Sequence, residues 1–210
     1  MDPRSFDLIS FAYGVAVLFT LWELVRNRRA LFDAQFTGAD FALAGRIGFL
    51  LLTPLGVLGH ELGHYATAAA LGGRGITLDF HVYWGYVTAH DITDPSAWFL
   101  VALAGPAVSV VLGFAALVAA RRIRQPAPAA ILQVFGSTSL LLILVAYPLI
   151  SFLTGSGDYL DIYSTRTPLL SAVTLACHGA LLVAMVALRR RRVRRSRRPG
   201  PPPAYRKADA

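Results

Sequence analysis

The most chemically informative residues of the sequence stand in one short string, His60-Glu61-Leu62-Gly63-His64. Residues four apart on a helix lie on the same face, so the two imidazoles can converge on one metal ion. Glu61 lies between them, where it can take a proton from a water molecule held by that ion. The string therefore predicts a hydrolytic metal site, with His60 and His64 as ligands and Glu61 as the general base.

The apolar surroundings of this string strengthen the metal interpretation. An ionised carboxylate at the centre of a membrane span costs roughly 2.5–3.5 kcal/mol on insertion scales. A divalent cation would compensate the carboxylate and both imidazoles at once, whereas the alternative is a buried His/Glu hydrogen-bond network. Two imidazoles, a carboxylate and an open fourth position are typical of Zn²⁺.

The third ligand must come from another part of the chain. Asp158 follows a long apolar stretch, and Gly155-Ser156-Gly157 would let the chain fold back towards the histidines, because glycine accepts unusual backbone angles. Asp161, three residues later, is the reserve ligand. A histidine in an apolar stretch is more often a hydrogen-bonded structural residue. The histidines outside the string are His81, His90 and His178.

The elements that must position these residues are membrane spans. Hydrophobic residues make up 55% of the 210 residues, charged residues only 15%, and no Asp, Glu, Lys or Arg occurs in three long stretches: 96–120, 125–157 and 167–188. Each stretch exceeds the ~20 residues that cross a bilayer. This excludes a soluble enzyme, and the single cysteine, Cys177, excludes a disulfide-rich scaffold.

The predicted fold class is therefore an all-α polytopic membrane protein with about five transmembrane helices. A single transmembrane domain covers 1–188, with predicted spans at 8–25, 47–71, 97–120, 130–153 and 167–188. β-Branched and aromatic residues at 77–88 predict a hairpin-like loop after the second span. The basic, Pro-rich tail at 189–210 has no apolar face to bury and is predicted to be disordered.

The distribution of basic residues predicts the orientation in the membrane. The net charge is +8, but most of it lies beside apolar segments, which indicates membrane topology and not binding to nucleic acid. Seventeen of the 20 Lys and Arg residues lie on one side if the C-terminus is cytoplasmic. We therefore expect a multi-pass cell-membrane protein with its N-terminus outside, in contact with the bilayer and, through the Arg run at 189–198, with anionic lipids.

Three motifs in order resemble the site-2 proteases, a family of intramembrane zinc metalloproteases. They are the histidine string within an apolar span, Leu103-Ala104-Gly105-Pro106-Ala107 in the next span, and an Asp after a further span, here Gly157-Asp158-Tyr159. The resemblance covers about residues 47–165 and is to the shorter variants of the family. Many members have Asn where this chain has Ser109, and many present the third ligand as Leu-Asp-Gly, which Leu160-Asp161-Ile162 matches only in part.

The resemblance implies hydrolysis of peptide bonds in membrane-anchored protein substrates. In that interpretation His60, His64 and Asp158 hold Zn²⁺ and Glu61 is catalytic. The alternative is a non-proteolytic metal-binding relative that acts as a binding or chaperone-like protein. A metal transporter or a di-iron lipid-modifying enzyme is disfavoured, because only the second span carries a cluster of ionisable groups and the chain has only five histidines.

Overall fold

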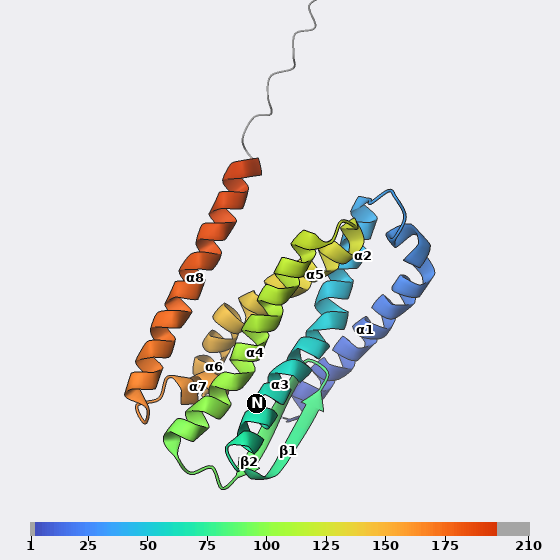
Figure 1. Ribbon diagram of the computed structural model, residues 1–210. Coiled ribbons are helices and arrows are strands. Elements are labelled where there is room, and N and C mark those ends of the chain that lie inside the picture. The colour runs from blue at the N-terminus through green and yellow to red at the C-terminus, as the bar shows by residue number, and fades with distance from the viewer. Residues whose placement is uncertain (1–2, 197–210) are drawn as a thin grey trace, which may run out of the picture.

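Five long apolar helices form the body of this protein in a computed structural model that describes residues 3–196 (Figure 1). Each is long and apolar enough to cross a membrane, and the fold is that of an all-α polytopic membrane protein, as predicted. The elements, in chain order, are α1 (Pro3–Leu31), α2 (Gly38–Arg46), η1 (Ile47–Leu51), α3 (Leu52–Ala70), β1 (Arg74–His81), β2 (Trp84–His90), α4 (Pro95–Arg122), α5 (Pro126–Leu141), η2 (Leu142–Ala146), α6 (Tyr147–Thr154), α7 (Asp158–Ile162) and α8 (Pro168–Ser196).

The first four spans are longer than the predicted ones, and the fifth nearly coincides with its prediction. They run over Ile9–Leu31, Gly38–Ala70, Pro95–Arg122, Pro126–Thr154 and Pro168–Ala187. The second shows the largest difference, because α2, η1 and α3 continue one another from Gly38 instead of beginning at 47. Its start is set by a capping box, in which Thr37 accepts from the Asp40 amide and Asp40 accepts from the Thr37 amide.

Two π-helical turns interrupt the second and fourth spans. Residues of η1 join α2 to α3, and residues of η2 join α5 to α6. Such turns leave some backbone carbonyls available to other donors. The Tyr159 hydroxyl donates to the Ile143 carbonyl of η2, and His178 Nε2 lies 2.8 Å from the Leu144 carbonyl. The η2 turn thereby connects the fourth span to both α7 and α8.

The predicted hairpin is present as β1 and β2, which pair antiparallel with Thr77 opposite Thr88 and His81 opposite Trp84. The tail differs from its prediction, because α8 continues to Ser196 and so includes the first residues of the segment predicted to be disordered. An Arg run can extend a helix that an apolar segment has already nucleated. The remainder of the predicted tail, 197–210, lies outside the described residues.

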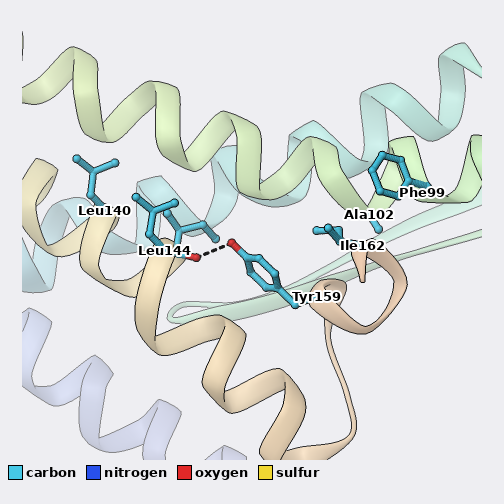
Figure 2. Packing of buried hydrophobic residues seen from close by; sticks show 7 residues of the cluster. Phe99, Ala102, Leu140, Leu144, Tyr159 and Ile162 are labelled. Atoms are coloured by element: carbon cyan, nitrogen blue, oxygen red, sulfur yellow. Dashed lines mark hydrogen bonds between the residues drawn. The ribbon is translucent and has the colours of Figure 1, made fainter. Parts of the chain in front are cut away.

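A buried cluster fixes the position of the short helix α7. Figure 2 shows Tyr159 and Ile162 of α7 packed between the fourth span and α4. The cluster consists of Phe99, Ala102, Leu140, Ile143, Leu144, Tyr159 and Ile162. Ile162 is fully buried, and the Tyr159 hydroxyl bonds to η2 in the same cluster. The backbone of α7 is therefore held at one end of the bundle, beside the hairpin end of α3 (Figure 1).

Candidate metal centre

The helix α3 presents His60 and His64 on one face, as their spacing predicts. Both side chains are buried, and their Nε2 atoms lie 3.0 Å apart. The two rings meet nearly edge-on, with an interplanar angle of 80°. Because the ring planes cross while the two Nε2 atoms converge, both imidazoles can direct a lone pair towards one point.

Asp158 reaches this point from the other side of the bundle. Its Oδ2 atom lies 3.0 Å from His60 Nε2 and 3.3 Å from His64 Nε2. The turn before it requires glycine, as predicted, because Gly155 has a φ of 67° and Gly157 a φ of 108°. Burial raises the pKa of the Asp158 carboxyl, but the two neighbouring imidazoles outweigh burial and hold that pKa below its usual range.

These three ligand atoms have the separations that a tetrahedral metal ion requires. Ligands at ~2.0–2.1 Å from a tetrahedral ion lie roughly 3.3 Å from one another. The three edges of the triangle formed by His60, His64 and Asp158 measure 3.0, 3.0 and 3.3 Å. The same three residues form a candidate metal-binding group among the described His, Cys, Asp and Glu residues.

The hydrogen bonds behind the rings indicate which ring nitrogens face the centre. His64 Nδ1 lies 2.7 Å from the Val101 carbonyl oxygen, which can only accept, so Nδ1 is the donor. The Nε2 atom of a neutral His64 then turns a lone pair towards the Asp158 carboxylate, which is repulsive without a positive charge between them. His60 Nδ1 similarly lies 3.0 Å from Ser109 Oγ. Ring nitrogens of metal-bound histidines are commonly held by such partners.

Gly105 of the Ala-Gly-Pro motif lies directly against the two imidazoles. A Cβ atom at this position would come within 2.7 Å of His60 Nε2 and would also overlap the His64 ring. Pro106, the next residue, has no amide proton to donate within α4. Gly105 therefore brings the α4 backbone against the site, and the Val101 carbonyl of the same helix lies behind His64.

The Glu61 side chain projects from α3 towards the hairpin. Its side chain is buried, and Oε2 has no hydrogen-bond partner among the described residues. The backbone of β2 passes close by, since a Cβ atom on Gly85 would come within 2.8 Å of Glu61 Cγ. A buried carboxylate oxygen without a partner is costly unless a water molecule or ligand satisfies it. Glu61 also lines the same cavity as His60.

The reserve ligand and the other histidines lie away from this centre. Asp161 Oδ2 accepts a hydrogen bond of 3.0 Å from Trp98 Nε1. His178 Nδ1 bonds to the Tyr163 hydroxyl, and its Nε2 bonds to η2, which fits the structural role expected of it. His81 stacks on Trp84 in the hairpin. His90 pairs with Arg74 in the strand register.

One polar residue near the centre was not predicted from the sequence. Tyr147 lies where η2 becomes α6, with its ring 6.0 Å from the His60 ring. Its hydroxyl accepts from the Asp158 amide at 3.4 Å. The sequence shows Tyr147 only as a polar side chain within the charge-free stretch 125–157. Its position there does not indicate that it contacts Asp158 and His60.

Comparisons of this chain with protein-family models, with curated proteins and with solved structures found no match.

Proposed function

We propose that this protein is an intramembrane zinc metalloprotease of the site-2 protease type, which hydrolyses peptide bonds in membrane-anchored proteins. The observation that carries the proposal is the convergence of His60, His64 and Asp158 beside a buried Glu61 whose Oε2 has no hydrogen-bond partner in residues 3–196. Two imidazoles and one carboxylate fit Zn²⁺, whose catalytic sites typically have three protein ligands and one open position.

Each residue has a distinct task in this mechanism. When bound, Zn²⁺ lowers the pKa of water and polarises the carbonyl group of the scissile bond. Glu61 accepts a proton from the attacking water and then donates it to the departing amine. Val101 and Ser109 hold the histidine rings in orientation, and Gly105 leaves room for the metal and its ligands. A protein that only binds metal has no need of an unpartnered carboxylate at this place.

The membrane orientation belongs to the same proposal. The basic residues at the end of α1, at the end of α4 and at the end of α8 gather at one end of the bundle in Figure 1, and the hairpin and α7 lie at the other. Basic residues accumulate on the cytoplasmic side of membrane proteins. We therefore place the N-terminus outside and the metal centre in the outer half of the bilayer, with anionic lipids beside the Arg run.

The deciding experiment compares metal content and cleavage in the same preparations. The full chain is purified, reconstituted with single-span reporter proteins and analysed by elemental analysis and by mass spectrometry of the products. We expect Glu61→Gln to keep one zinc ion and to lose cleavage, whereas His60→Ala loses both. The control is Glu23→Gln, which changes a carboxylate of α1 that pairs with Arg46. We expect this variant to keep both its zinc and its cleavage activity.

Two results would contradict the proposal. Cleavage that persists in Glu61→Gln would remove the general base from the mechanism. Zinc that binds normally to the wild type, together with no cleavage of any reporter, would favour the non-proteolytic alternative.

A further inference from the structure

A cavity of about 230 Å³ lies beside the metal centre, and both His60 and Glu61 form part of its wall. It extends from these residues along α3 to Thr53, two helical turns towards the opposite end of the bundle. The fourth span forms the facing wall, and residues 83–85 of the hairpin close one side. A side chain attached to an atom bound at the metal centre could therefore reach into this cavity.

The lining of the cavity is mostly apolar. Its walls include Val57, Leu112, Phe135, Leu142 and Ile143. Phe135 is buried against Gly56, whose Cβ position would lie 3.1 Å from the aromatic ring. A cavity of ~150 Å³ lined by Leu, Ile and Phe holds a benzene molecule. The cavity here is larger, so it can receive an aromatic ring or a branched aliphatic side chain.

We propose that this cavity is a specificity pocket, which receives a large apolar side chain, of the size of Leu or Phe, next to the bond that is cut. The inference rests on the proposed function, because it needs a scissile bond at the metal centre. A segment taken from a membrane span supplies such side chains, and the pocket selects among them by size. In an apolar pocket each methylene group changes the specificity by roughly 10–200-fold.

Two serines of α5 provide a matched pair of variants. Ser139 lines the cavity, whereas Ser137, two residues earlier on the same helix, is exposed on the outer surface. Ser139→Leu adds apolar atoms inside the pocket. Ser137→Leu makes the same chemical change towards lipid. A difference between them therefore reports on the space inside the pocket and not on the added hydrophobicity or its effect on detergent binding.

The probes are hydroxamates, which chelate a metal ion through their own oxygens and need no knowledge of the natural substrate. Binding of acetohydroxamate and phenylpropanohydroxamate to the zinc-loaded full chain is measured by calorimetry in detergent. We expect the phenyl compound to bind at least about tenfold more tightly to the wild type and to Ser137→Leu. In Ser139→Leu this preference falls below about threefold, because the ring no longer fits.

A second variant tests the pocket in the opposite direction. Phe135→Leu shortens the side chain at the far wall, so it should shift the preference towards the larger naphthyl analogue. Equal binding of the small and large hydroxamates to the wild type would overturn the pocket, as expected if a lipid chain fills the cavity. A preference that survives in Ser139→Leu would also overturn it. If neither hydroxamate binds, the metal centre itself is wrong, and the proposed function fails with it.

Discussion

Asp158 and Asp161 are three residues apart on α7, yet their carboxylates have different partners. Asp158 Oδ2 lies within 3.3 Å of Nε2 of both histidines, whereas Asp161 Oδ2 accepts from Trp98 at the start of α4. The buried cluster of Figure 2 holds α7 in the orientation that separates them. The choice between the two carboxylates as third ligand thus depends on how α7 is packed.

This relationship gives a direct prediction for metal binding. Asp158→Asn removes one charged ligand and should lower zinc affinity by more than about a hundredfold, because the loss of an outer partner alone costs 10–100-fold. Asp161→Asn is the matched control and should retain zinc, since it changes only the bond to Trp98. Competition with a zinc-sensitive dye measures both affinities. Equal zinc loss in the two variants would contradict this assignment.

Ser109 is expected to act on the metal through His60. Its Oγ lies 3.0 Å from His60 Nδ1, so Ser109→Ala releases one side of the ring. We expect zinc affinity to fall roughly 10–100-fold, as for other outer partners of metal-bound histidines. Ser109→Thr keeps the hydroxyl and should restore most of the affinity. If Ser109→Ala and Ser109→Thr bind zinc equally well, the hydroxyl has no such role.

Gly105 provides a test in which the helix and the site respond in opposite directions. Within a helix, Gly→Ala is ordinarily favourable by ~1 kcal/mol. At Gly105 the added Cβ would overlap both imidazoles, so Gly105→Ala should leave the protein folded and abolish zinc binding. Gly179→Ala in α8 is the control, because no heavy atom of the described part of the chain lies within 4 Å of its Cβ position. Circular dichroism and zinc content measure the two effects, and normal zinc binding by Gly105→Ala would refute the steric argument.

The parts of this site that the sequence predicts are those set by local geometry. His60 and His64 converge because they are four residues apart on one helix, and the turn before Asp158 follows from its two glycines. The five spans follow from apolar length alone. Contacts such as His60–Ser109 are different, because 49 residues separate them in the chain. Such contacts depend on how closely α3 packs on α4, which no local pattern specifies.

The helix ends show the same limit in another form. Apolar length predicts the middle of a span, but the second span begins at a capping box formed by Thr37 and Asp40. Glu23, a charge near the end of the first predicted span, forms a 2.9 Å ion pair with Arg46. Hydropathy counts these polar groups as unfavourable in a span, although each has a partner in the folded protein. It therefore places the end of the first span and the start of the second incorrectly.

The orientation in the membrane can be tested independently of catalysis. Cys177 is the only cysteine, so Cys177→Ala gives a cysteine-free background for single substitutions. Arg74 in the hairpin has an 85% exposed side chain, and Arg124 is exposed between α4 and α5, at the opposite end of the bundle. In intact cells a membrane-impermeant maleimide should label Arg74→Cys and should label Arg124→Cys only after permeabilisation.

The reverse pattern would place the metal centre in the cytoplasmic half of the bilayer, because α7 and the hairpin lie at the same end. It would also mean that the basic residues at the ends of α1 and α4 do not determine the topology, although such residues normally remain on the cytoplasmic side.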